Sequence, residues 1–227
     1  MEFNPELIVM LTYNDVTVEN ASEIFKNAKN SKAKFWGFKE SGIPLNEMKS
    51  LFSEMKLYEK NTALEVVAYT ESECLDGAKM AKECKCDILM GTCFFDSVNE
   101  FCKENNIKYM PFVGDVSGKP SVLNGEISDI IDEAKEYIKK GVYGFDLLAY
   151  RYTGDVKKLI ETFSREINAP VCIAGSVDTY EKLQFLKEQP IWALTIGSAF
   201  FQNKFGEGFE QQINEVNNFL YKETVKK

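Results

Sequence analysis

The chain has 227 residues, 44% of them hydrophobic, which suits one larger α/β domain or two small ones. Its formal charge is -8 at pH 7 with acidic and basic residues interleaved, and this argues against nucleic acid or a membrane as a partner, because both bind clustered Lys and Arg. No apolar run approaches the length of a membrane span, and the start MEFNPE lacks the features of a signal peptide. We therefore expect a cytoplasmic protein.

Short apolar, β-branched or aromatic runs are predicted strands, and they cover 6–14, 33–39, 63–70, 86–94, 107–115, 143–151, 169–176 and 191–198. Amphipathic stretches typical of helices follow each of them, at 18–30, 44–60, 71–85, 96–106, 126–141, 155–168, 179–189 and 207–223. Asp96, Asp155 and the pair Ser176 and Asp178 are predicted helix starts, and Pro44 fits a first helical turn.

This regular alternation of strand and helix predicts the fold class. Eight strand-helix units of about 28 residues, without a linker, favour one compact (β/α)8 barrel, the TIM-barrel fold, as a single domain over residues 1–227. A doubly wound open sheet is the alternative. The longest connection between a strand and a helix is expected at 114–125.

The cysteine and histidine content restricts the chemistry. The chain has six cysteines and no histidine, and Cys84 and Cys86 are the only close pair. A Cys-x-Cys without a second pair and without His is a poor zinc signature, so we expect no metal and no cofactor. Acid-base chemistry would then use carboxylates, lysine, tyrosine or cysteine.

Two Gly-Ser pairs end the last two predicted strands, Gly175-Ser176 and Gly197-Ser198. In a (β/α)8 barrel, phosphate commonly lies where the seventh and eighth strands deliver their loops. Glycine lets the backbone approach a phosphate, serine adds a hydroxyl donor, and the N–H groups that open the next helix favour an anion. The four residues are therefore a predicted phosphate site, the alternative being that both glycines only close tight turns.

The segments PVCIAGSVDTYEKL (170–183) and WALTIGSAFF (192–201) resemble the paired phosphate-binding signature of the ribulose-phosphate-binding barrel superfamily. That superfamily includes enzymes of the phosphoribosylanthranilate isomerase, N-acetylmannosamine-6-phosphate 2-epimerase and indole-glycerol-phosphate synthase types. The resemblance covers 169–201 and is generic elsewhere. It implies that the two turns grip a phosphorylated sugar.

Two candidate catalytic residues lie on the second and third predicted strands. Lys39 follows the aromatic run FWGF, which predicts a lowered pKa suited to a base or a Schiff-base nucleophile. A lysine on the rim, paired with Glu40 or Glu71, is the alternative. Glu65 interrupts an apolar strand, where a carboxylate is unfavourable unless it is paired or used. Glu65 also resembles the inward-facing glutamate of indole-glycerol-phosphate synthase.

Two aspartates complete the predicted catalytic set. Asp115 ends the fifth predicted strand and Asp146 lies in the sixth, and in isomerases of the superfamily aspartates near these strands act as general acids. Asp146 has a structural alternative, an ion pair with Lys39 or Arg151. At the end of strand one, where those isomerases carry Asp or Cys, this chain offers Asn14 and then Asp15. Arg151 and Asn14 are predicted to bind the substrate.

Together these residues predict a metal-independent isomerase or epimerase that moves a proton next to a carbonyl of a small phosphorylated sugar. A lyase or aldolase that uses Lys39 as a Schiff base is one alternative, and a phosphosugar-binding barrel without catalysis is another. The sequence leaves both a monomer and a homodimer open.

Overall fold

The strands that surround the barrel axis form one parallel sheet. In the computed structural model, which describes residues 4–221, the order in this eight-stranded sheet is β10-β11-β12-β1-β4-β5-β6-β7, and its ladders are parallel. The strands are β1 (Glu6–Met10), β4 (Phe35–Lys39), β5 (Asn61–Ala68), β6 (Ile88–Thr92), β7 (Lys108–Met110), β10 (Phe145–Leu147), β11 (Val171–Ile173) and β12 (Ala193–Ile196). Backbone hydrogen bonds from Tyr143 to Tyr109 and from Asp146 to Pro111, both 3.0 Å, connect β10 to β7. The predicted TIM barrel is confirmed.

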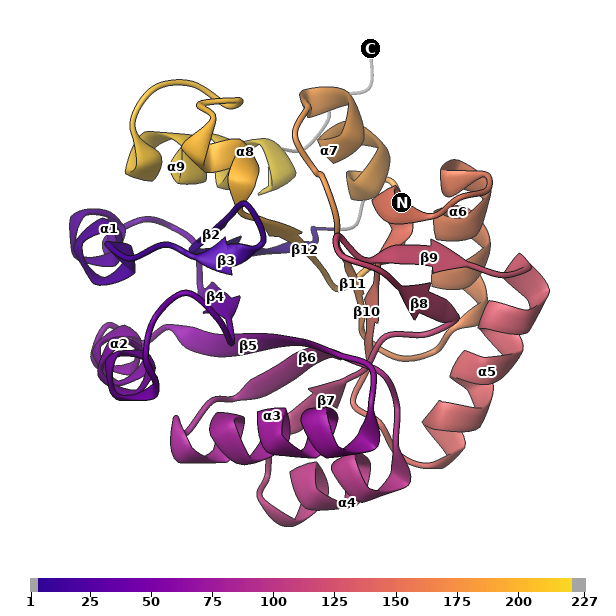
Figure 1. Ribbon diagram of the computed structural model, residues 1–227. Coiled ribbons are helices and arrows are strands. Elements are labelled where there is room, and N and C mark those ends of the chain that lie inside the picture. Colours follow the sequence, from indigo (N-terminus) through magenta and orange to yellow (C-terminus); the bar gives the residue numbers. More distant parts are fainter. Residues whose placement is uncertain (1–3, 222–227) are drawn as a thin grey trace.

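The helices form a ring outside the strands (Figure 1). They are α1 (Ala21–Ala28), α2 (Leu45–Leu57), α3 (Glu71–Glu83), α4 (Asp96–Glu104), α5 (Ile127–Lys139), α6 (Val156–Glu166), α7 (Tyr180–Lys187), α8 (Ser198–Phe201) and α9 (Phe209–Tyr221). Each predicted helix is present, although residues 222–223 of the last lie outside the described residues, and the short α8 is additional. Within residues 4–221, no helix combines the length and apolarity that crossing a membrane requires.

Side-chain alternation along β4 explains how strand and helix layers pack. Trp36 and Phe38 point outward, where the ring of Trp36 lies 5.1 Å from that of Phe25 on α1 and the ring of Phe38 lies 4.1 Å from that of Phe52 on α2. Successive strand residues face opposite sides, so Gly37 and Lys39 face the barrel interior. The aromatic run that precedes Lys39 therefore contributes mainly to the layer between sheet and helices.

The barrel interior is apolar and is closed at the amino-terminal ends of the strands. Its buried cluster consists of Ile8, Met10, Ala63, Ile88, Met90, Met110, Cys172 and Ala193. Next to this cluster, the ring of Trp192 lies 5.3 Å from that of Phe35 and 6.2 Å from that of Tyr143. These three aromatic rings fill the amino-terminal end, which leaves the carboxyl-terminal end for a site.

Two short hairpins replace parts of predicted strands at the carboxyl-terminal end. The strand predicted over 6–14 ends at Met10, and β2 (Thr12–Tyr13) then turns back into β3 (Val16–Thr17). Asn14 and Asp15 form the turn with φ values of 50° and 68°, which Asn and Asp tolerate better than other side chains. The long connection at 114–125 folds into the hairpin of β8 (Asp115–Ser117) and β9 (Val122–Asn124).

The predicted helix starts are confirmed in part. Asp155 caps α6 by accepting the N–H of Lys158 at 3.1 Å, and Asp96 is the first residue of α4. The start predicted at Ser176 and Asp178 is wrong, because Thr179 caps α7 by accepting the N–H of Lys182.

Candidate active site

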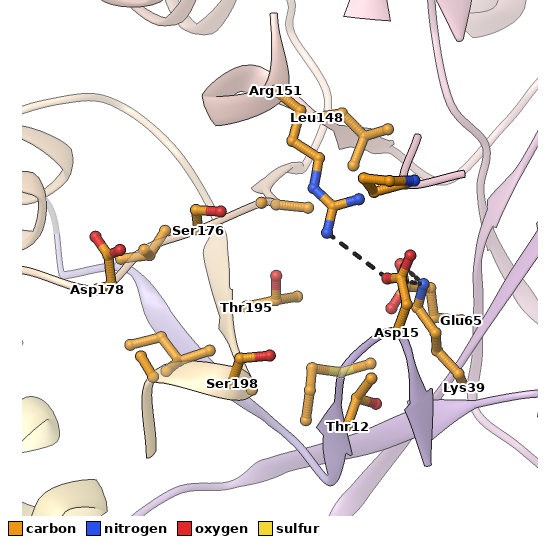
Figure 2. A pocket seen from close by; sticks show the side chains of 18 of the residues that line it. Thr12, Asp15, Lys39, Glu65, Leu148, Arg151, Ser176, Asp178, Thr195 and Ser198 are labelled. Carbon is orange, nitrogen blue, oxygen red and sulfur yellow. Dashed lines mark hydrogen bonds and ion pairs between the residues drawn. The ribbon is translucent and has the colours of Figure 1, made fainter. Parts of the chain in front are cut away.

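A cavity of about 530 Å³ opens at the carboxyl-terminal end of the barrel, a volume typical of sites for small molecules. Its wall comes from the middle of β5, the ends of β1, β4 and β12, the start of α8, the two hairpins, the loop after β11 and the 3₁₀ turn η1 (Ala149–Arg151). In Figure 2, Ser176 and Ser198 lie on one side of the cavity and Asp15, Lys39 and Glu65 on the other, with Arg151 extending between them.

Both Gly-Ser turns line the cavity at the same end. Gly175 has a φ of 88°, a conformation that glycine adopts without steric cost. Gly197 lies so close to the β2 backbone that a Cβ there would be 2.8 Å from the carbonyl oxygen of Thr12. Ser198 opens α8, where the first N–H groups have no intrahelical acceptor. The first turn differs from the prediction, since α7 begins only at Tyr180 and the turn presents loop backbone.

Lys39 faces the opposite end, and its amine is held by carboxylates. Its Nζ donates a hydrogen bond to Asp15 Oδ1 at 2.8 Å and lies 3.7 Å from Glu65 Oε1, with the side chain only 8% exposed. Burial alone would lower the pKa of Lys39, but the charges of Glu65 and Asp15 and the hydrogen bond outweigh burial and raise it. The predicted lowered pKa is therefore wrong. The carboxylates that pair with the amine are also not Glu40 or Glu71, the partners that the structural alternative named.

The hairpin of β2 and β3 fixes Asp15 above Lys39. Thr17 is buried in β3, and its Oγ1 donates to the backbone oxygen of Lys39 at 2.7 Å and accepts the backbone N–H of Lys39 at 2.9 Å. Asp15 Oδ1 also lies 3.6 Å from a guanidinium nitrogen of Arg151. Burial opposes ionisation of Asp15, but the hydrogen bond and charge of Lys39, helped by Arg151, hold its pKa below the usual range.

Glu65 lines the cavity, whereas Asp146 lies in the interior beneath it. Asp146 on β10 is the register partner of Cys172 on β11, and Cys172 is the register partner of Ala193 on β12. Ala193 faces the barrel interior one layer below Thr195, which lines the cavity, so Asp146 also lies one layer below the cavity wall. Asp146 is 1% exposed, and within residues 4–221 neither of its carboxyl oxygens has a hydrogen-bond partner, so the predicted ion pair with Lys39 or Arg151 is not formed.

Burial raises the pKa of both carboxyl groups. For Glu65 the charge of Lys39 partly opposes this effect. For Asp146 the nearby charge of Glu65 adds to burial, and the pKa lies well above its usual value. Two neighbouring carboxyl groups seldom ionise together. The arrangement favours a neutral Asp146 beneath Glu65, whose pKa is raised by burial and held down in part by the charge of Lys39.

The other predicted site residues are divided between the cavity and the surface. Arg151 lines the cavity from η1, and Asn14 lines it from the hairpin turn. Asp115 does not, because the fifth barrel strand ends at Met110 and Asp115 is an exposed residue at the start of β8. Asp15 was not among the predicted site residues, although an Asn-Asp pair between two short β-prone segments indicates a tight hairpin turn.

The cysteines are mostly buried and do not form a metal site or a disulfide among the described residues. All six lie within residues 4–221 and are free thiols, five of them buried. Burial raises the pKa of Cys84 to about 11 and that of Cys86 to about 12, so neither is a ready metal ligand. Within the described part of the chain, no group of three or more Cys, Asp or Glu side chains could hold a metal ion.

No protein-family model matches the chain, and no curated protein is similar to it in sequence. Solved structures share its fold. Thiamine phosphate pyrophosphorylase from Pyrococcus furiosus superposes with a TM-score of 0.68 at 15% identity, over 96% of each chain. Orotidine 5'-monophosphate decarboxylase from Methanocaldococcus jannaschii gives 0.66 at 16% identity, over 96% of this chain and 100% of that chain. N-acetylmannosamine-6-phosphate 2-epimerase from Clostridium perfringens gives 0.63 at 12% identity, over 86% of each. These similarities confirm the predicted resemblance at the level of the fold.

Proposed function

We propose that this protein is an isomerase or epimerase of a small phosphorylated sugar, and that it transfers a proton next to the carbonyl without a metal. One observation carries the proposal: the Lys39 ammonium and the Glu65 carboxylate share a cavity with the two Gly-Ser turns, and they face it from the opposite end. A ligand with a phosphate at one end and a carbonyl at the other fits this division.

The phosphate is assigned to Gly175, Ser176, Gly197 and Ser198. The turns offer backbone N–H groups and two hydroxyls at adjacent strand ends, where barrels commonly bind phosphate. The names of all three structural neighbours refer to a phosphorylated compound, which is consistent with this assignment. Those neighbours differ in reaction, so the reaction is argued from Lys39 and Glu65.

Lys39 polarises the carbonyl in this proposal, and Glu65 acts as the base. The Lys39 ammonium donates to the carbonyl oxygen, and Glu65 takes the proton from the neighbouring carbon. The C–H electron pair forms a C=C bond, and the carbonyl oxygen becomes the enediolate oxygen beside Lys39. Return of the proton to the other carbon, as the neighbouring hydroxyl proton passes to the enediolate oxygen, isomerises the sugar. Epimerisation returns a proton to the opposite face of the same carbon, which requires a donor other than Glu65 on that face. Asp146 stays neutral, which leaves Glu65 as the carboxylate that ionises.

The lyase alternative is less well supported by the surroundings of Lys39. A Schiff base needs a neutral amine, but Lys39 is paired with Asp15 and Glu65, and their charges raise its pKa. The same pairing suits an ammonium that stabilises a developing oxygen anion.

The test begins with a thermal-shift screen of phosphorylated sugars and continues in D₂O with each compound that binds. Mass spectrometry should show deuterium next to the carbonyl, Glu65→Gln should lose this exchange, and borohydride should leave no adduct on Lys39. Glu100→Gln, an exposed change on α4, is the matched control and should exchange normally. A borohydride adduct on Lys39 would instead establish the lyase. Phosphate-ester binding without exchange across the panel would establish a binding protein.

A further inference from the structure

We infer that the Lys39 end of the cavity accepts an uncharged group and excludes a second anion, and that Asp15 determines this specificity. The inference rests on the proposed function, because it takes the phosphate to lie at the Gly-Ser turns. It narrows the substrate class to phosphorylated sugars with a neutral carbonyl or hydroxyl head, as opposed to phosphorylated sugar acids.

The charges at this end are already balanced within the protein. Lys39 and Arg151 are the cations that line the cavity, and one oxygen of Asp15 lies 2.8 Å from the first and 3.6 Å from the second. Glu65 lies 3.7 Å from Lys39. Asp15 therefore occupies the position between the two cations that a carboxylate of a ligand would need.

An uncharged ligand oxygen can bind the Lys39 amine without meeting the repulsion from Asp15 that a carboxylate would meet. An ammonium group has three N–H donors. Asp15 accepts one of them at 2.8 Å, and Glu65 at 3.7 Å is an ion-pair partner beyond hydrogen-bond distance, so the amine keeps a donor for a carbonyl or hydroxyl oxygen. A carboxylate at the same place would lie against Asp15, whose side chain is 39% exposed, and like charges in contact disfavour binding.

Asp15 is held in place at the base of its hairpin. The two hydrogen bonds between Thr17 and the Lys39 backbone, together with a third from the Thr17 N–H to the Ser41 oxygen at 2.9 Å, fix β3 to the end of β4. The turn thus positions the Asp15 carboxylate as part of the wall, so an entering anion would not simply displace it.

The proton transfer itself is compatible with this charge balance. When Glu65 takes the proton, it becomes neutral as the ligand oxygen becomes negative, so the number of negative charges near Lys39 does not change. A substrate carboxylate would add one more negative charge before and after the transfer.

Ribitol 5-phosphate and 5-phosphoribonate test the inference, since they share the phosphate and differ in the head group. By isothermal titration at pH 8, the wild-type protein should bind ribitol 5-phosphate more tightly than 5-phosphoribonate. Asp15→Asn should shift the affinity ratio toward 5-phosphoribonate by about tenfold or more, equivalent to about 1.4 kcal/mol. Asparagine tolerates the positive φ of this position, so the turn should be retained.

Asp178→Asn is the charge-matched control. Asp178 also lines the cavity, but its carboxylate binds Lys182 at 2.7 Å, so this change should leave the ratio of the two affinities nearly constant. If the wild-type protein binds 5-phosphoribonate as tightly as ribitol 5-phosphate, or if Asp15→Asn leaves the ratio unchanged, the inference is wrong although the phosphate site stands. If neither compound nor inorganic phosphate binds, the proposed function is wrong and the inference falls with it.

Discussion

Replacing Asp146 by Asn should remove a loss of stability that the wild-type protein shows as the pH rises. The carboxyl is 1% exposed and has no hydrogen-bond partner among residues 4–221, and burial together with the charge of Glu65 raises its pKa well above 3.8. The folded protein therefore keeps a proton that the unfolded chain releases above about pH 4. The contribution of Asp146 to the free energy of unfolding is therefore highest below the unfolded pKa and falls until the pH passes the folded pKa.

The magnitude follows from the linkage of one proton. Each pH unit between the two pKa values lowers the free energy of unfolding by 2.303RT, about 1.4 kcal/mol. Asparagine has nearly the same shape and does not titrate, so Asp146→Asn should lack this slope. The amide also buries polar atoms in an apolar site, an effect that does not change with pH. The slopes, and not the absolute stabilities, are the quantities to compare.

Urea unfolding followed by circular dichroism between pH 4.5 and 9 measures these slopes. The wild-type free energy of unfolding should fall with pH relative to that of Asp146→Asn. Asp115→Asn is the control, because it removes an exposed carboxyl on the β8–β9 hairpin, and its curve should parallel that of the wild-type protein. Equal slopes for the wild-type protein and Asp146→Asn would show that Asp146 is ionised in the fold, and the assignment of Glu65 as the ionising carboxyl would be refuted.

Two further predictions concern the walls of the cavity. Thr17→Val keeps the shape of a buried side chain but leaves the N–H and carbonyl of Lys39 without their partner, so urea unfolding should show a loss of about 1–3 kcal/mol. The control Thr162→Val, at a half-buried position on α6, removes only a hydroxyl that donates to the Lys158 carbonyl one turn earlier, and it should lose less than about 0.5 kcal/mol. Equal losses in the two variants would contradict the anchoring role of Thr17. Gly197→Val should lower both the melting temperature and phosphate-ester affinity, because its Cβ meets the Thr12 carbonyl at 2.8 Å. Ser198→Asp should keep the melting temperature yet weaken phosphate-ester binding by about tenfold or more, since it adds a negative charge at the proposed phosphate site. Undiminished affinity in Ser198→Asp would refute that placement.

The barrel was predictable because its signal is local and repeated. Alternating strand and helix periodicity recurs along the chain, and each predicted strand overlaps a barrel strand. Strand ends were less predictable. Residues 11–13 continue the apolar and β-prone pattern of β1, yet the chain leaves the sheet after Met10, and the reversal is marked by the Asn14-Asp15 pair with its positive φ values. Asp115 was misplaced for the same reason, since the fifth strand ends at Met110 and a hairpin follows.

The two Gly-Ser turns were predictable as neighbours, because the carboxyl ends of adjacent parallel strands meet at the same end of a barrel. The pKa of Lys39 was not predictable in the same way. The aromatic residues before it suggested an apolar surrounding, but Trp36 and Phe38 pack outward against helices. The carboxylates that raise the pKa come from a separate hairpin and a neighbouring strand, and such contacts depend on register and turn geometry.

These observations separate the residues proposed for the reaction from the residue proposed for specificity. Lys39 and Glu65 are register partners on adjacent strands, so the distance between them is set by the barrel sheet. Asp15 lies outside that sheet, on a hairpin that the Thr17 contacts attach to the end of β4. Replacing Asp15 can therefore change which head group is accepted, while the strands keep Lys39 and Glu65 side by side at the cavity. A barrel of this kind can acquire a new substrate through its hairpin, because the strands that carry the proton transfer need not move.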